Sequence, residues 1–270
     1  MDWSSALRNT LRDRALAWAS AQSVPHYVSL GQTPTVLFEC AGDGQKHGNF
    51  HPDAWNAIVS DPSWRLRLDK PHSQSRALPP DKAATARELD SSNSSDALVM
   101  NCFCFPGASQ RVLKSLGLST DPAARPEFGV KAKLPLADGS EDATEIDMRV
   151  GSILFEAKLT EKDFTSRSAA HVQRYRDLPT HLEVSALPSD GSELGGYQLI
   201  RNVLAAAHHN ATLIVLVDQR RPDLLQEWWG IHLAIRDVGL RLRCGFRTWQ
   251  QVASVSPPPL REFLAGKYGL

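Results

Sequence analysis

A short turn is the feature that most constrains the fold of this chain. Two stretches typical of strands, 144–150 and 152–159, meet at the pair Gly151-Ser152. Glycine at the first central position of a two-residue loop favours a type II′ hairpin. Counting outward from such a turn, Asp147 lies directly opposite Glu156 in the antiparallel ladder.

Two carboxylates in these positions repel each other unless something lies between them. Directly opposed residues have Cβ atoms only about 5 Å apart, and like charges there destabilise a sheet. A divalent cation would turn the repulsion between Asp147 and Glu156 into chelation, and Mg²⁺ prefers such oxygen ligands. Strand alternation places Lys158 on the same face as Glu156, with Ala157 on the other. The alternative is a solvated strand face, where a Glu-x-Lys pattern is common.

If the cation is present, the position of Lys158 beside it predicts a chemical role for this side chain. An ammonium beside a metal ion could orient an attacking water or stabilise charge on a phosphate group. Acting as a base would require a strong shift of its pKa from the reference value of about 10.4. Orientation and charge stabilisation are therefore the roles we expect for Lys158.

The segments around the hairpin predict one α/β domain, because strand and helix patterns alternate. A strand is expected before the hairpin, at 130–136. After it we expect a helix at 196–209, a central strand at 212–217, a helix at 224–238, and a half-exposed strand at 240–244. Short helices at 248–255 and 260–264 end the chain.

The first part of the chain predicts a mostly helical extension. Apolar residues at helical spacing run from Trp3 to Trp18, and Ser94-Ser95-Asp96 is a typical N-cap cluster for the next long helix. Further elements expected are a strand at 35–40, a loop at 42–50, and helices at 52–59 and 109–116. Few large apolar residues occur over 69–95, which predicts a long mobile loop with one helical turn at 83–89.

Charge and composition exclude some classes of protein. Lys+Arg and Asp+Glu both number 30, so a surface that is cationic throughout is excluded. The sum hides an asymmetry: residues 196–270 hold nine basic and five acidic residues, a net of +4. Arg220-Arg221, Arg241, Arg243 and Arg247 could track a phosphate backbone, together with Trp228, Trp229 and Trp249, or form an ordinary solvated edge.

The expected compartment is the cytoplasm. No apolar run approaches the ~20 residues of a membrane span, and charged residues interrupt the N-terminus where a signal peptide would be apolar. The four cysteines lack the spacing of a zinc site and predict reduced thiols.

Four stretches in order along the chain carry a resemblance to a known family. They read S-S-D-A-L-V-M-N-C-F at 94–103, T-E-I-D at 144–147, E-A-K-L-T-E-K-D-F at 156–164 and Y-Q-L-I-R-N at 197–202. They are similar to the S-S-x-A-x-x-x-N-x-F helix, the acidic strand, the E-x-K-x-T-E-x-x-F segment and the Q-L-I-R-N helix of a bacterial subgroup of the PD-(D/E)XK nuclease superfamily. The resemblance implies a restriction-endonuclease-like core, αβββαβ, with a central mixed sheet flanked by helices.

The resemblance also implies roles for individual residues. Asp147, Glu156 and the backbone carbonyl of Ala157 become metal ligands, and Lys158 becomes the catalytic lysine. Glu127 is a candidate extra ligand, with a plain surface glutamate as the equal alternative. The remaining candidates, for contacts behind the ligands or with phosphate, are Gln198, Arg201, Asn202 and Glu161. Gln198 could bond the active-site water or Lys158, and Arg201 could bind a phosphate; the alternative is that Arg201 and Asn202 satisfy buried groups.

Together these observations predict a Mg²⁺-dependent endonuclease of the cytoplasm, with Mn²⁺ as a substitute metal. The expected substrate is nucleic acid, above all DNA, and the resemblance leaves a homodimer open. The whole chain is expected to form one nuclease-like domain: an extension over 1–93, a core over 94–255 and a tail over 256–270. The alternative is a catalytically silent module that binds nucleic acid or protein on the same fold.

Overall fold

The computed structural model describes residues 2–41, 44–72 and 77–270. Its contacts form two compact units, Met1–Pro126 with Trp249–Leu270, and Glu127–Thr248. These boundaries differ from the expected extension, core and tail. In particular, the helices that follow Ser94 and Gly107 belong to the first unit rather than to the unit that holds the hairpin.

A five-stranded mixed sheet forms the centre of the second unit. Its order is β13-β12-β9-β8-β5. The hairpin strands β8 and β9 are antiparallel, whereas β12 runs parallel to both β9 and β13. The strands are β5 (Pro126–Lys131), β8 (Glu145–Val150), β9 (Ile153–Ala157), β12 (Thr212–Val217) and β13 (Cys244–Thr248).

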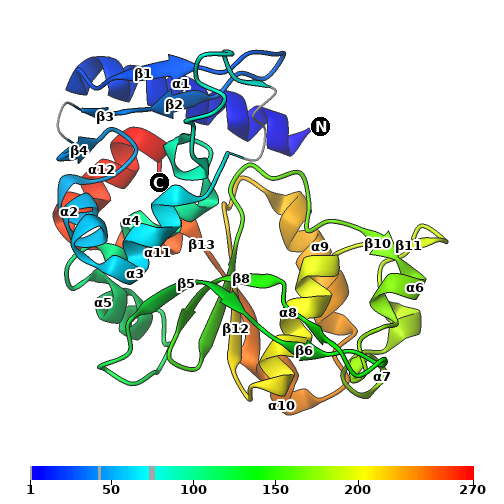
Figure 1. Cartoon of the computed structure of the whole chain (residues 1–270). Coiled ribbons are helices and arrows are strands. Elements are labelled where there is room, and N and C mark those ends of the chain that lie inside the picture. Colours follow the sequence, from blue (N-terminus) through cyan, green and yellow to red (C-terminus); the bar gives the residue numbers. More distant parts are fainter. Residues whose placement is uncertain (1, 42–43, 73–76) are drawn as a thin grey trace. The chain divides into compact units, whose positions relative to one another are not determined.

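Helices α8 (Tyr197–His208) and α9 (Pro222–Leu233) pack with this sheet. Helix α8 lies against the strands of the sheet in Figure 1. Its residues Leu199 and Val203 share one apolar cluster with Leu154 of β9 and Val215 of β12. Every residue of β9 is buried, as expected for a strand with neighbours on both sides. The predicted α/β class, with a mixed sheet and flanking helices, is confirmed.

The register of the hairpin is the predicted one. Val150 pairs with Ile153, and the ladder continues to the pair of Met148 with Phe155. Gly151 has φ of +58°, a backbone conformation that glycine adopts without steric cost. The next step along this register brings Asp147 level with Glu156.

The predicted strand at 240–244 is wrong. Residues Val238–Arg243 form helix α10, and the edge strand β13 begins only at Cys244. Asp237 caps this helix, because its side chain accepts a hydrogen bond from the N–H of Leu240. The alternation of Leu and Arg over 240–243 therefore reflects a short helix, and the expected helix at 224–238 ends at Leu233.

The smaller elements of the second unit form its loops. They are β6 (Leu134–Pro135), β7 (Glu141–Asp142), β10 (Arg167–Ser168), α6 (Ala169–Val172), α7 (Leu178–His181), η4 (Val184–Ala186) and β11 (Glu193–Leu194).

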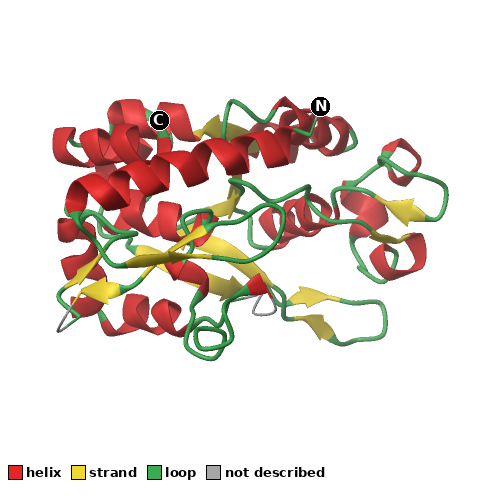
Figure 2. Cartoon of the chain, turned by 90° about the horizontal axis from the view of Figure 1, so that it is seen from above, coloured by secondary structure: helices red, strands yellow, loops and turns green. Residues whose placement is uncertain are grey.

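The first unit combines helices with two small hairpins, and helices account for more of the chain than strands do (Figure 2). Helix α1 buries Leu7, Leu11 and Ala15 on one face, as its apolar spacing predicts. The elements are α1 (Trp3–Gln22), β1 (His26–Val28), β2 (Val36–Phe38), β3 (Cys40–Ala41), β4 (Lys46–His47), α2 (Pro52–Ser60), α3 (Pro62–Arg65), η1 (Leu66–Asp69), η3 (Glu88–Asp90), α4 (Ser95–Cys104), α5 (Ala108–Ser115), α11 (Trp249–Val255) and α12 (Pro258–Tyr268). The predicted N-cap is confirmed: the Oγ of Ser94 accepts a hydrogen bond from the N–H of Ala97 at 3.1 Å.

The expected mobile loop at 69–95 is packed where the structure describes it. Leu78, Ala86 and Leu89 are buried, and Lys70 forms an ion pair of 2.7 Å with Asp96. A few apolar side chains at irregular spacing are enough to hold the segment in place. The composition of the segment did not indicate this packing. Residues 73–76 of this loop, and 42–43 of the loop expected at 42–50, lie outside the described residues.

None of the helices in the described ranges combines the length and the hydrophobicity that a membrane span requires. All four cysteines are free thiols, as expected; Cys102, Cys104 and Cys244 are buried and Cys40 is exposed.

Replacing Gly151 with alanine should lower the free energy of unfolding by about 1–2 kcal/mol, because a side chain at positive φ is strained. Urea unfolding followed by circular dichroism measures this change. The control is Ser152→Ala, which alters the exposed neighbour in the same turn and should change stability by less than about 0.5 kcal/mol. Equal effects of the two substitutions would contradict the strain argument.

Candidate active site

The carboxylate of Glu156 is the centre of the candidate site. Its side chain is 0% exposed on β9. Oε1 accepts a hydrogen bond from Nζ of Lys158 at 2.8 Å, and Oε2 accepts one from Nδ2 of Asn202 at 2.6 Å. A buried carboxylate is tolerated only with such partners. Both oxygens of Glu156 are therefore held in fixed positions.

Lys158 is buried as well, with 6% of the residue exposed. Burial by itself lowers the pKa of this lysine, but the carboxylates of Glu156, Glu161 and Asp147 together outweigh it and raise the pKa above its ordinary value. The side chain is therefore an ammonium at neutral pH. An ammonium cannot accept a proton, so this geometry agrees with a role in orientation and charge stabilisation.

Asp147 reaches the same place from β8. It is half-buried, and its Oδ2 accepts a hydrogen bond from the backbone N–H of Ala157 at 2.8 Å. This bond joins the side chain of one hairpin strand to the backbone of the other, one residue beyond Glu156. The structure thus brings together Asp147, Glu156 and Lys158, the three residues that the hairpin register predicted.

Helix α8 supplies the residues behind Glu156. Arg201 is 3% exposed, and its Nη2 donates to the carbonyl of Glu145 at 2.9 Å and to Oδ1 of Asn202 at 3.3 Å. Arg201 therefore orients the amide that binds Glu156, which matches the alternative that it satisfies buried groups and leaves it no solvent-facing position for a phosphate. Gln198 is half-buried one turn earlier on the helix, and its backbone N–H donates to the carbonyl of Phe164 at 3.0 Å.

The two remaining candidates, Glu127 and Glu161, each bind a neighbouring group. Glu127 is an exposed residue, and Arg149 binds both of its carboxylate oxygens, at 3.2 and 2.7 Å. That is the arrangement of a surface glutamate. Glu161 accepts a hydrogen bond from the N–H of Leu159 at 2.6 Å, and its charge contributes to the raised pKa of Lys158.

Arg221 holds the loop after Lys158, a role that the sequence pattern did not reveal. Its side chain is 0% exposed and donates to the carbonyls of Leu159, Glu161 and Lys162. Both alternatives for Arg221, a phosphate track and a solvated edge, are wrong, because its side chain is enclosed. One local signal was available in the sequence. Asp223 lies in the first turn of α9 and binds the same guanidinium at 2.8 Å.

The rest of the predicted basic and aromatic surface is also partly internal. Arg220 pairs with the buried Asp218 at 2.5 Å, and Trp228 and Trp249 are buried. Trp229 is the exposed member of the three tryptophans. The described structure thus favours the alternative of an ordinary protein surface over a continuous track for phosphates.

Glu227 of α9 is a second residue that sequence reasoning missed. Its Oε2 accepts a hydrogen bond from the N–H of Phe164 at 3.2 Å. Burial raises the pKa of Glu227, while the nearby Lys158 lowers it by a smaller amount. No motif identified this position, because its partner lies 63 residues away in the chain.

The donor atoms of the site fit a hard cation. Two carboxylates and the backbone carbonyl of Ala157 would offer oxygen atoms, and Mg²⁺ typically takes one or two carboxylates with water and phosphate oxygens. Each carboxylate oxygen has two lone pairs, so one hydrogen bond does not exhaust it. Within the described ranges, no group of three or more His, Cys, Asp and Glu side chains is arranged to hold a metal ion.

Comparison with known proteins supports this fold. A family model described as "Restriction Endonuclease associating with ARP" matches residues 26–269. The chain belongs to this family. No curated protein and no solved structure matches it. Membership of a restriction endonuclease family, together with the mixed sheet and its helices, identifies the fold as restriction-endonuclease-like.

Replacing Asn202 with alanine should destabilise the protein by about 1–3 kcal/mol, because Oε2 of the buried Glu156 loses its donor. Asn202→Asp should cost more, since it places a second carboxylate beside Glu156. Both changes are measurable as a lower midpoint of urea unfolding. Gln198→Ala, on the same face one turn away, is the control and should have a smaller effect; an Asn202→Ala protein as stable as this control would contradict the assignment.

Proposed function

We propose that this chain is a Mg²⁺-dependent nuclease of the PD-(D/E)XK type that hydrolyses phosphodiester bonds, with DNA as its substrate. The observation that carries the proposal is the convergence of Asp147, Glu156 and Lys158 at the end of one hairpin. The restriction endonuclease family supports it independently. Mn²⁺ would be expected to substitute for Mg²⁺, because both accept oxygen ligands.

Each residue has a role that follows from its contacts. Asp147, Glu156 and the Ala157 carbonyl would hold the metal ion, which when bound supplies a more acidic water and neutralises negative charge. Lys158 donates to Glu156 and can orient the attacking water or stabilise charge on the phosphate. Asn202 and Arg201 keep Glu156 in place, and Arg221 keeps the loop after Lys158 in place.

A catalytically silent module that binds nucleic acid or protein is the competing function. It would have no need to keep two carboxylates beside an ammonium in a buried setting, where charges are costly. The intact set of Asp147, Glu156 and Lys158 therefore favours an enzyme. A cytoplasmic location and a homodimer remain predictions; light scattering of the purified chain would test the second.

Purified protein should cleave plasmid or linear DNA with Mg²⁺ and lose this activity with EDTA. Asp147→Asn, Glu156→Gln and Lys158→Ala should each lower the cleavage rate by at least about a hundredfold, the scale on which one positioned electrostatic group contributes. Gel electrophoresis of the DNA products measures the rate, and circular dichroism checks that each variant is folded.

Glu127→Gln is the matched control, because it removes a carboxylate of the same sheet that Arg149 already binds. It should leave cleavage within a few-fold of the original rate. A loss as large as that of Glu156→Gln would instead make Glu127 a ligand. DNA binding without any metal-dependent cleavage, in the original chain and the three variants alike, would favour the silent module.

A further inference from the structure

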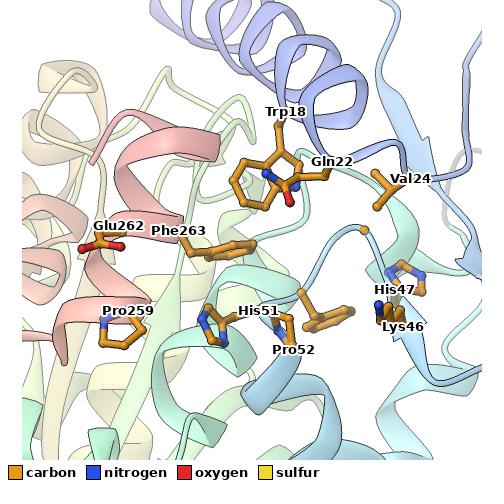
Figure 3. Close-up of a pocket in the computed structure, with 12 residues that line it drawn as sticks. Trp18, Gln22, Val24, Lys46, His47, His51, Pro52, Pro259, Glu262 and Phe263 are labelled. Carbon is orange, nitrogen blue, oxygen red and sulfur yellow. The ribbon is translucent and has the colours of Figure 1, made fainter.

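The first unit contains a cavity that the candidate active site does not use. Its volume is about 430 Å³, within the range of small-molecule sites. Trp18 and Gln22 of α1 line it from one side and Phe263 of α12 from another, with His51 below them and Glu262 at the edge (Figure 3). All of these residues belong to Met1–Pro126 or Trp249–Leu270.

The aromatic walls are held in place by their neighbours. The rings of Trp18 and Phe263 meet edge to face, with centroids 5.2 Å apart. The ring of His51 lies 5.7 Å from that of Phe263, also edge to face. Nζ of the buried Lys267 lies 5.4 Å from the Phe263 ring centroid and donates to the carbonyl of Asn49 at 2.7 Å. The cavity is therefore formed before any ligand arrives.

The polar groups of the cavity can form hydrogen bonds with the edge of a planar ring. Nδ1 of His51 accepts a hydrogen bond from the N–H of Asp53, so the neutral imidazole carries its proton on Nε2. Burial lowers the pKa of His51 despite the opposing charge of Asp53, which keeps the ring neutral. Gln22 offers both a donor and an acceptor, and Glu262 an acceptor. In the described part of the chain the side chains of Gln22 and Glu262 form no hydrogen bond and no ion pair.

We propose that this cavity binds a nucleobase. A base presents a π face that can stack on the ring of Trp18 or of Phe263, and an edge of donors and acceptors for His51, Gln22 and Glu262. Lys46, an exposed residue of the lining, suits a phosphate attached to the base. The base comes either from a free nucleotide or from a nucleotide turned out of DNA. The second source rests on the proposed nuclease function, but base binding needs no metal.

The experiment measures tryptophan fluorescence of the full chain in EDTA, where no cleavage occurs. Adenosine, guanosine, cytidine and thymidine monophosphates are titrated separately, followed by DNA duplexes with and without one unpaired base. At least one of these ligands should quench the fluorescence and saturate. Saturation by a mononucleotide identifies a free nucleotide as the ligand; saturation only by the duplex with an unpaired base identifies the extruded base.

Two substitutions locate the binding. Gln22→Trp places a large ring at the cavity mouth and should weaken binding at least tenfold. Trp18→Leu removes one stacking surface together with the reporting fluorophore, and it should weaken binding equally when bound nucleotide is measured by equilibrium dialysis. Ser20→Trp is the matched control, since Ser20 is exposed on the same helix and does not line the cavity. It should bind as the original chain does. Urea unfolding of all three confirms that they fold.

Three results would overturn the proposal. One is the absence of saturable quenching by every nucleotide and duplex. Another is binding that Gln22→Trp leaves unchanged. The third is displacement of the signal by choline chloride, which would assign the cavity to cations. None of these results bears on Mg²⁺-dependent cleavage through Asp147 and Glu156, and loss of cleavage in those variants does not bear on the cavity.

Discussion

The buried carboxylate of Glu156 is the interaction on which the site depends. A charge with no exposed surface is stable only when its partners are correctly placed, and removing one partner of a buried pair costs about 3–5 kcal/mol. Here Lys158 supplies the charge, and Asn202 the second hydrogen bond. The strand β9 and the helix α8 must therefore keep a fixed relation. The chemistry proposed for the site and the packing of the second unit both require these residues to keep fixed relative positions.

Buried arginines extend this requirement to the surroundings of the site. Arg201 connects α8 to the start of β8 through the carbonyl of Glu145, and Arg221 connects α9 to the carbonyls that follow Lys158. A planar guanidinium has five donors in a fixed geometry, so one side chain can hold several backbone groups. The loop after Lys158 is thus tied to the start of α9 by several hydrogen bonds. An enzyme that must position a metal and a phosphate benefits from such a rigid frame.

The two units carry different kinds of site. The second unit holds charged groups that compensate one another, an environment suited to a metal and a phosphodiester. The first unit holds an aromatic cavity with neutral and exposed polar groups, including Trp18, His51 and Phe263. Cleavage and base recognition place different demands on a protein, because one needs strong local fields and the other needs shape and hydrogen bonds. If both proposals hold, different residues of the chain meet the two demands.

The amino-acid sequence by itself determined the hairpin and, through it, the meeting of Asp147, Glu156 and Lys158. A two-residue turn with glycine sets the register of its strands, and strand alternation then assigns every side chain to a face. These are short-range rules that spacing along the chain expresses. The helix at Val238–Arg243 has a local signal, its N-cap Asp237, which the alternation of Leu and Arg obscured. The tertiary structure decided the partners of Arg201, Asn202 and Arg221. The hydrogen bonds of these three side chains join segments up to 62 residues apart, as between Arg221 and Leu159. The local spacing of residues therefore does not predict them.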